Sequence, residues 1–280
     1  MKSVVVTGVS TGIGWGVTKV LIGQGFRVFG SVRKAADAER LSQEFGEAYS
    51  PLTFDVTDEA AVHAAAAEVR DALGGEPLAG LVNNAGVAVP GPLLHLPLAD
   101  FRQQIEVNLI GVVCVTQAFA PLLSPGAGSA AKPGRIVNIS SVGGRNGMPF
   151  MAPYIASKFA IEGLSESLRR ELMLLGIDVI VVAPGAVATA IWAKADKIDI
   201  TPYRGTVFMA AMEKMRGFMN GQGGLPPEKL GAVVAKALTT AKPKVRYTVA
   251  PDPFPTFLLA NLPRRVADRL IGGRLGLLPK

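Results

Sequence analysis

The sequence contains few of the side chains that form disulfides and metal centres. Among its 280 residues there is one cysteine, Cys114, and the two histidines, His63 and His95, lie far apart in the sequence. A single cysteine excludes an internal disulfide and agrees with a reducing compartment, so we expect a cytoplasmic protein. With so few nitrogen and sulfur ligands, we expect no structural zinc site and assign no metal ligand.

The sequence also lacks a long uninterrupted apolar run. The most apolar stretches are interrupted by Glu106 and Asn108, or by Asp178, so none reaches the roughly 18 residues that mark a membrane-spanning helix. The apolar residues between Lys2 and Gly8 are too few for the core of an export signal. We therefore expect a soluble protein.

Acidic residues are outnumbered by basic ones, 22 to 29, which gives a formal charge of +7. Several basic residues stand late in the chain: Arg264, Arg265, Arg269, Arg274 and Lys280. They form either a solvated face or a surface that attracts anionic ligands or a membrane. They do not form a compact nucleic-acid motif, so we expect no nucleic-acid partner.

The order of predicted elements is typical of an α/β fold. At 49% hydrophobic residues, the chain can bury the core of one domain, residues 1–280. Short β-branched or apolar runs alternate with helical spacing, which predicts a Rossmann-type, doubly wound, seven-stranded parallel sheet with helices on both faces. The predicted strands are residues 3–7, 26–32, 49–56, 78–82, 135–140, 177–183 and 244–249. The first predicted helix ends near Gln24, and the second covers 58–73. A third begins at Asp100, a fourth runs from the Tyr154 region to about Leu175, and a fifth covers 226–240.

A glycine-rich turn follows the first predicted strand and opens a helix. It reads Gly8-Val9-Ser10-Thr11-Gly12-Ile13-Gly14. Glycines let the backbone approach a pyrophosphate, and a helix N-terminus presents free N–H groups to it. The spacing differs from Gly-x-Gly-x-x-Gly, and a plain tight connection is the alternative, but the context favours a nucleotide-binding loop.

The end of the second strand favours NADP(H) over NAD(H). NAD-binding proteins carry an acid there for the ribose 2′-OH. Here Val32 occupies that place and Arg33-Lys34 follow, and an arginine can pair with a 2′-phosphate. The alternatives are that Arg33 and Lys34 are ordinary loop charges, or that Asp37 substitutes for the acid and allows NAD(H).

Residues 140–158 contain the groups expected for acid–base chemistry on oxygen. Tyr154 and Lys158 stand four apart, which places both on one face of a helix. A nearby ammonium lowers the pKa of a phenol from its ordinary value of about 10, and the Ser141 hydroxyl can hold a substrate oxygen. This spacing also occurs by chance on many helices. The three side chains can move a proton, but the reaction needs a separate source of hydride.

Two polar segments are expected near the same sheet edge. Asn83-Asn84-Ala85-Gly86 ends the fourth strand, where it fits a ligand crevice or a simple turn. Asn108 lies inside an apolar helical pattern, as a hydrogen-bonded core residue or as part of a site. Pro184-Gly185 ends the sixth strand.

Two segments fall outside the strand–helix alternation. Residues 190–225 are rich in methionine and predict either a substrate lid or an amphipathic helix that covers the core. Residues 251–280 form an apolar and basic C-terminal extension. It is expected to complete the substrate pocket, to make weak contact with a membrane surface, or to meet a partner subunit.

Taken together, these motifs resemble the short-chain dehydrogenase/reductase family. The resemblance runs from Lys2 to about Thr189, and residues 28–33, 246–249 and 262–265 are weakly similar to its retinoid- and steroid-type branch. It implies that Tyr154 is the general acid/base, that Lys158 assists it and binds the nicotinamide ribose, that Ser141 positions the substrate, and that Asn108 supports a water. The implied cofactor-binding residues are Gly8, Ser10, Thr11, Gly12, Ile13, Gly14, Arg33, Lys34, Asp55, Val56, Asn83, Ala85, Gly86, Pro184, Gly185, Val187 and Thr189, with Tyr154 and Lys158.

The resemblance implies an NADP(H)-dependent oxidoreductase that interconverts a carbonyl and an alcohol on a small lipophilic molecule, such as a steroid, a retinoid or an aliphatic ketone or aldehyde. It also implies a homodimer or homotetramer that uses a small-molecule substrate. The alternative is a sensor or scaffold protein that binds NADP without catalysis.

Overall fold

A parallel sheet forms the centre of the protein. The computed structural model describes residues 1–125, 130–188, 199–220 and 224–279. Seven strands pair in the order β3-β2-β1-β4-β5-β6-β7. The chain returns after β3 to place β4 beside β1, and the doubly wound α/β fold is confirmed. The strands are β1 (Ser3–Val6), β2 (Arg27–Val32), β3 (Tyr49–Thr53), β4 (Gly80–Asn83), β5 (Arg135–Ile139), β6 (Asp178–Pro184) and β7 (Arg246–Val249).

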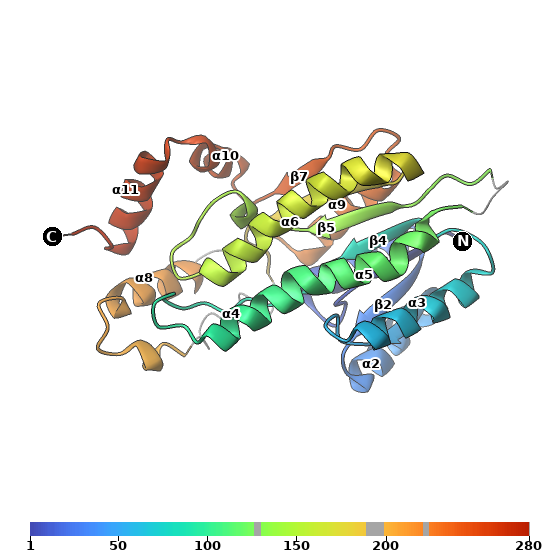
Figure 1. The fold of residues 1–280 in the computed structure, drawn as a ribbon, viewed down its shortest axis with the longest axis horizontal. Helices are drawn as coiled ribbons and strands as arrows, with labels where there is room; N and C mark the ends of the chain where they lie inside the picture. The colour runs from blue at the N-terminus through green and yellow to red at the C-terminus, as the bar shows by residue number, and fades with distance from the viewer. Residues whose placement is uncertain (126–129, 189–198, 221–223, 280) are drawn as a thin grey trace.

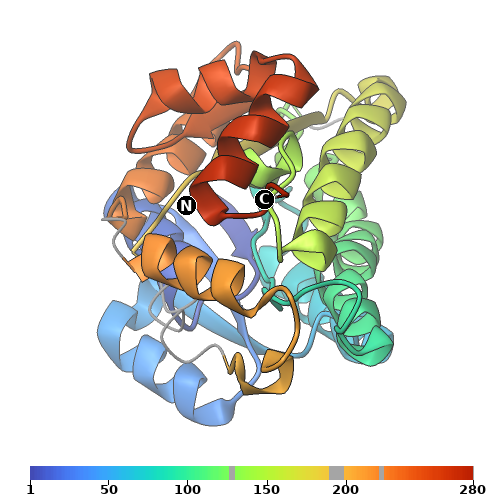
Figure 2. The same cartoon turned by 90° about the vertical axis from the view of Figure 1, so that its left-hand side faces the viewer.

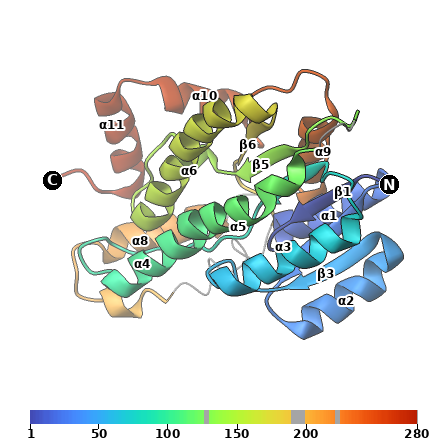
Figure 3. The same cartoon turned by 45° about the vertical axis from the view of Figure 1, so that its right-hand side comes forward.

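Helices cover both faces of the sheet because successive strand residues point to opposite sides. Val4 and Val6 belong to one buried cluster, with α1 (Gly12–Gly23), α2 (Ala35–Phe45) and α9 (Pro227–Thr239). Val5 belongs to a second cluster, with α3 (Glu59–Leu73), α5 (Gly111–Phe119) and α6 (Ala152–Glu171). Figures 1 and 3 show the second set of helices in front of the sheet. Short helical turns lie at η1 (Gly46–Ala48), η3 (Ala120–Leu123), η4 (Val142–Gly144), η5 (Leu172–Leu175) and η7 (Thr201–Tyr203).

The third strand ends earlier than predicted, at Thr53 instead of residue 56. Asp55 begins a turn in which its carboxylate accepts hydrogen bonds from the backbone N–H and the hydroxyl of Thr57, at 3.0 and 2.9 Å. A side chain that bonds the backbone two residues later competes with the sheet ladder.

The long helix predicted from Asp100 contains a π-helical turn. It starts at Leu98 as α4 (Leu98–Ile105), continues through η2 (Glu106–Ile110), and ends in α5. From Leu98 to Leu123 the helix has 26 residues, and its most apolar 18-residue window has a mean hydropathy of 1.6, so only by length and composition is it long and apolar enough for a membrane span. In the fold it packs against α3, α6 and β4, as one of the helices that cover the sheet.

Two glycines let α1 and α9 touch backbone to backbone. A Cβ on Gly16 would lie 2.5 Å from the carbonyl carbon of Pro227, and a Cβ on Gly231 would lie 2.5 Å from the Gly16 carbonyl oxygen. Lys19 and Glu228 form an ion pair at 3.0 Å beside this contact. The helix that follows the glycine loop is therefore held by a helix from the last quarter of the chain.

Three helices gather at one end of the molecule, α8 (Met209–Asn220), α10 (Pro253–Asn261) and α11 (Arg264–Leu275) (Figure 2). Met212 and Met215 of α8 are buried together with Leu275 of α11 and with Phe150. This third cluster lies apart from the two that cover the sheet. The described part of the predicted lid thus includes the turn η7 and the helix α8, which packs on the C-terminal extension. Residues 190–198 and 221–223 of that prediction lie outside the described residues.

Candidate active site

A cavity of about 460 Å³ opens at the carboxyl ends of the central strands. The glycine loop and the end of β2 line one part of it, and the ends of β4, β5 and β6 line the rest. Its predicted lining residues are Gly8, Ser10, Thr11, Gly12, Ile13, Arg33, Asp55, Val56, Ala85, Gly86, Asn108, Ser141, Tyr154, Lys158, Pro184, Gly185 and Val187. Thr189 lies outside the described residues.

The glycine loop adopts a shape that larger residues would disturb. Gly8 has a φ of +70°, and a Cβ there would lie 2.8 Å from the Ala85 Cα. Gly14 does not line the cavity but packs behind the loop, where a Cβ would lie 2.3 Å from the Gly8 carbonyl oxygen. The Gly8 N–H donates to Ser31 Oγ at 3.1 Å, so the loop is fixed to β2.

The loop places the N-terminus of α1 at the cavity. Thr11 occupies the N-cap position without a side-chain cap hydrogen bond, and the first turn of α1 contains no acidic residue. Its backbone N–H groups and the positive end of the helix dipole thus face no competing anion from this helix. Together with the close backbone approach at Gly8, this arrangement fits the pyrophosphate of a dinucleotide.

Arg33 lines the cavity, whereas Lys34 and Asp37 do not. The Arg33 side chain is 70% exposed, and its guanidinium lies 3.7 Å from the Asp55 carboxylate, so it is available to an anion. Lys34 is exposed at the start of α2 and is absent from the cavity lining. Asp37, the alternative acid, pairs with Arg40 at 3.3 Å, and Arg40 also donates to the Ser10 carbonyl.

Asn83, which the resemblance implies as a cofactor-binding residue, does not line the cavity. Its side chain is buried and donates to Thr116 Oγ1 at 3.0 Å and to Asn138 Oδ1 at 2.8 Å. Asn84 lines the cavity instead, and its amide donates to the Thr7 and Gly8 carbonyls. Because Asn83 is the last residue of β4, strand alternation turns its side chain away from the cavity.

Asn108 stands within the π-helical turn and connects two parts of the site. Its Oδ1 accepts from the Val87 N–H at 2.8 Å, and its amide donates to the Val87 carbonyl at 3.0 Å and to Ser157 Oγ at 3.1 Å. π-helical turns within α-helices often occur at functional sites. Here the turn carries the side chain that joins the loop after β4 to α6.

Ser141, Tyr154 and Lys158 meet in the same cavity. Ser141 Oγ accepts from the Gly143 N–H at 3.0 Å and lies 3.4 Å from the Pro184 carbonyl oxygen. Lys158 is buried, and its Nζ donates to the Ile139 carbonyl at 2.8 Å and lies 5.7 Å from the centre of the Tyr154 ring. A phenol, a hydroxyl and an amine thus surround one space where a substrate oxygen can bind.

The pKa values of this set differ from the sequence prediction. Burial raises the pKa of Tyr154, and a hydrogen bond from Ser141 opposes the rise. Burial also lowers the pKa of Lys158 to about 8, and the Glu162 carboxylate opposes that change. The sequence predicted a lowered phenol pKa, but the desolvation of Tyr154 is the largest effect in the structure. Tyr154 is therefore protonated at neutral pH and can donate a proton.

The C-terminal extension approaches this region without lining the cavity. Arg264, the first residue of α11, donates to Asn146 Oδ1 at 3.3 Å, and Asn146 lies between Ser141 and Tyr154 in the chain. The cavity is lined by no residue of 251–279, the part of the extension that the structure describes. The extension thus supports the segment that carries the site, and its role as part of the pocket stays a prediction.

Several lining residues were not named as site residues from the sequence. They are Ser31, Val32, Phe54, Asn84, Val87, Ala88, Pro90, Val107, Ile139, Ser140 and Met151. Eight of them are apolar, and they lie within strands, in loops, or in or beside a helix. No chemical signal in the sequence would have marked them as site residues. Their side chains give the cavity its apolar wall.

Comparison with known proteins finds one family over most of the chain. The family model described as "short chain dehydrogenase" matches residues 2–199. An "NADPH-dependent 3-dehydrocapnine reductase" of Ornithobacterium rhinotracheale is 41% identical over 255 residues, which cover 90% of this chain and 89% of that protein. The mouse "Short-chain dehydrogenase/reductase family 9C member 7" is 31% identical over 96% of this chain and 88% of its own length. The crystal structure of a short-chain dehydrogenase from Streptomyces avermitilis matches with a TM-score of 0.75 and 28% identity, over 99% of this chain and 97% of that chain.

Proposed function

Because this chain belongs to the short-chain dehydrogenase family and is an oxidoreductase that acts on alcohol and carbonyl groups, we propose that it reduces a ketone on an apolar small molecule with NADPH. The observation that carries the proposal is the single cavity that joins the glycine loop and Arg33 to Ser141, Tyr154 and Lys158. When bound, the nicotinamide supplies the hydride that the chain's own side chains lack.

In the proposed reduction, Tyr154 donates its hydroxyl proton to the carbonyl oxygen. Its raised pKa keeps it protonated at neutral pH, so the donor form is the resting form. Ser141 donates a hydrogen bond to the same oxygen and orients it. The positive charge of Lys158 stabilises the phenolate that Tyr154 becomes, and a proton from solvent then restores the phenol.

The proposed cofactor preference depends on the end of β2. Arg33 is exposed to the cavity, and the acid that would bind a ribose 2′-OH is absent there. A guanidinium binds a phosphate through paired, charge-assisted hydrogen bonds. The relative that is 41% identical is named as NADPH-dependent, which supports the same preference.

The proposed substrate is a small-molecule ketone with an apolar part that the cavity wall can contact. Val107, Ile139 and Met151 give the cavity an apolar wall near Ser141 and Tyr154. The name of the relative supports 3-dehydrocapnine itself as the first candidate, while a steroid, a retinoid and a simple aliphatic ketone represent the wider class.

Wild-type protein and Tyr154→Phe, assayed for NADPH oxidation with each candidate ketone, test this proposal. We expect wild-type turnover of at least one ketone and a loss of several orders of magnitude in kcat for Tyr154→Phe, with NADPH affinity largely kept. Near-normal turnover by the variant would falsify the assignment of Tyr154. Tight NADPH binding without turnover of any candidate would favour a sensor or scaffold protein instead.

We further propose a homo-oligomer formed through the long helix and α6. Only 33% of the most apolar window of that helix is buried within the chain, and Ile110 and Phe159 are 45% and 43% exposed. Light scattering coupled to gel filtration tests this, and Phe159→Glu should dissociate the assembly. A monomeric wild type would refute it.

A further inference from the structure

A glutamate follows the proposed catalytic pair on the same helix. Glu162 stands one turn after Lys158, as Lys158 stands one turn after Tyr154, so α6 presents all three on one face. The Glu162 side chain is only 14% exposed. A carboxylate so far removed from water needs a charged or hydrogen-bonding partner.

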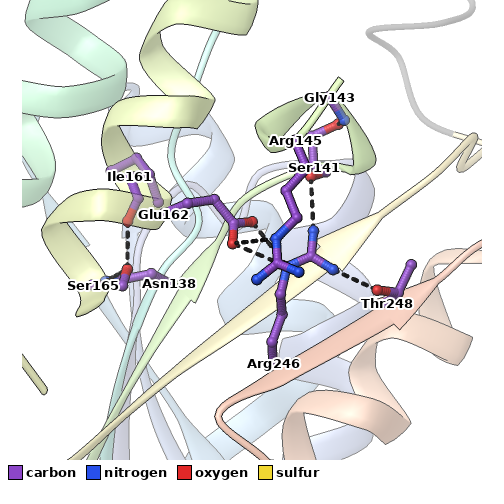
Figure 4. A network of polar contacts seen from close by, with 9 residues as sticks. All are labelled: Asn138, Ser141, Gly143, Arg145, Ile161, Glu162, Ser165, Arg246 and Thr248. Atoms are coloured by element: carbon purple, nitrogen blue, oxygen red, sulfur yellow. Dashed lines mark hydrogen bonds and ion pairs between the residues drawn. The ribbon is translucent and has the colours of Figure 1, made fainter. Parts of the chain in front are cut away.

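That partner is Arg246 on β7. Its Nε donates to both Glu162 oxygens, at 2.9 and 3.2 Å, and the arginine is also 14% exposed. The same guanidinium lies 3.5 Å from the Ser141 carbonyl oxygen and contacts Thr248 (Figure 4). The pair therefore connects α6, β7 and the segment that carries Ser141.

The surrounding segment is packed closely onto this pair. A Cβ on Gly144 would lie 2.6 Å from Ser140 Oγ and 3.0 Å from a Glu162 carboxylate oxygen. Ser140 Oγ is buried and has no hydrogen-bond partner in the described part of the chain. The backbone after Ser141 thus rests against Glu162, and a shift of this carboxylate would move it.

Glu162 also faces other charged and titratable groups, which determine its effect on the site. They are Lys158 of α6, Arg145 just after η4, which lies 3.6 Å away and is 62% exposed, and Arg246 of β7. From β5, Lys158 meets only the Ile139 backbone carbonyl. Glu162 is the carboxylate whose charge opposes the effect of burial on Lys158.

We infer that Glu162 and Arg246 are positioning residues for the proposed ketone reduction, which hold Ser141 in line with Tyr154 and balance the charge of Lys158. This inference rests on the proposed function. Neither residue lines the cavity, so both act through the residues that do. Removal of the pair should change kcat and its pH dependence more than NADPH affinity.

The first test compares two arginines that contact the same carboxylate. Arg246→Met removes the bonds to Glu162 and Ser141, whereas Arg145→Met removes only an ion pair at 3.6 Å from a mostly exposed arginine. We expect kcat to fall at least tenfold in Arg246→Met and to change less than twofold in Arg145→Met, with the NADPH Kd unchanged in both. If the methionine variant fails to fold, Arg246→Lys, which keeps the charge, tests the contact with Glu162 and Ser141 instead. Equal kcat for the lysine variant and wild type would overturn the positioning role.

The second test uses Glu162→Gln, which keeps the shape and removes the charge. We expect the alkaline limb of the kcat profile to move to lower pH by about half a pH unit or more, because Lys158 loses its proton sooner. Arg145→Met should show no such downward shift. A profile that coincides with wild type would overturn the electrostatic part of the inference.

A third measurement separates this inference from the proposed function. With carbon-13 at the lysine ε-carbons, the Lys158 signal is the one that disappears in Lys158→Met, and its titration needs no substrate. We expect Glu162→Gln to move that titration to lower pH even in a protein that turns over none of the ketones. An unmoved titration would refute the inference, whereas absent wild-type turnover would refute only the proposed function.

Discussion

Replacing Lys158 by methionine should remove a pH-dependent cost to the stability of the fold. Burial lowers the pKa of this lysine from its ordinary 10.5 to about 8. One pKa unit corresponds to about 1.4 kcal/mol, so keeping the buried amine protonated at neutral pH costs roughly 3 kcal/mol. The methionine side chain has a similar length and carries no proton, so the variant lacks this cost.

The sign of the pH dependence follows from which state holds the proton more strongly. The pKa of the folded protein is the lower one, so between about pH 8 and 10.5 the unfolded chain carries more protons and stability rises with pH. The cost is fully present below about pH 8 and disappears as the pH approaches 10.5. Between pH 7 and pH 9.5, wild type should therefore gain about 2 kcal/mol relative to Lys158→Met.

Urea denaturation of both proteins at one fixed protein concentration measures this difference. Methionine also leaves the Ile139 carbonyl without its donor, which costs about 1–3 kcal/mol at every pH. That loss lowers the unfolding free energy of the variant by the same amount at every pH, so the pH dependence of the difference between the two proteins is unchanged. Lys242→Met, which replaces an exposed lysine, is the matched control and should follow wild type. If the unfolding free energies of wild type and Lys158→Met change in parallel with pH, the folded protein does not disfavour the charged amine.

Three further predictions concern the cofactor loop and the C-terminal extension. Arg33→Ala should weaken NADPH binding about ten- to a hundredfold, as the loss of a hydrogen bond to a charged group predicts, and leave NADH binding within a few fold; equal losses for both cofactors in a fluorescence titration would contradict a phosphate contact. Gly14→Ala should abolish NADPH binding or lower the melting temperature, because its Cβ would lie 2.3 Å from the Gly8 carbonyl oxygen; unchanged values by calorimetry and thermal shift would show that the loop can adjust. Phe254 and Phe257 are 72% and 65% exposed beside the basic residues of α11, so wild type should float with liposomes of anionic lipid, and the double replacement by serine should not. Equal flotation of both proteins would refute a membrane contact of α10.

The sequence was sufficient to predict the central architecture because its strands are short, β-branched and regularly separated. The glycine loop and the four-residue spacing of Tyr154 and Lys158 depend only on local geometry. For that reason the predicted chemical groups meet in one cavity.

Other features depend on contacts that a sequence does not display. The run Asn83-Asn84 does not reveal where β4 ends, so Asn83 was predicted as a site residue, whereas Asn84 lines the cavity. Spacing alone could have put Glu162 on the face of Lys158, but its partner Arg246 is 84 residues away. The effect of burial on the Tyr154 pKa likewise requires knowledge of what surrounds the ring. Helices α10 and α11 were not predicted, because their apolar residues do not follow one helical period.

The backbone contact between α1 and α9 has a practical consequence for anyone who wishes to divide this protein. The family match ends at residue 199, and a fragment cut there would retain the glycine loop and every residue of the proposed proton transfer. Yet it would lack α9, so it would uncover the glycine surface of α1 and remove Leu230 and Val234, which are buried in the same cluster as Val17 and Leu21 of α1. We expect such a fragment to aggregate, so nucleotide binding cannot be isolated as a smaller module of this chain.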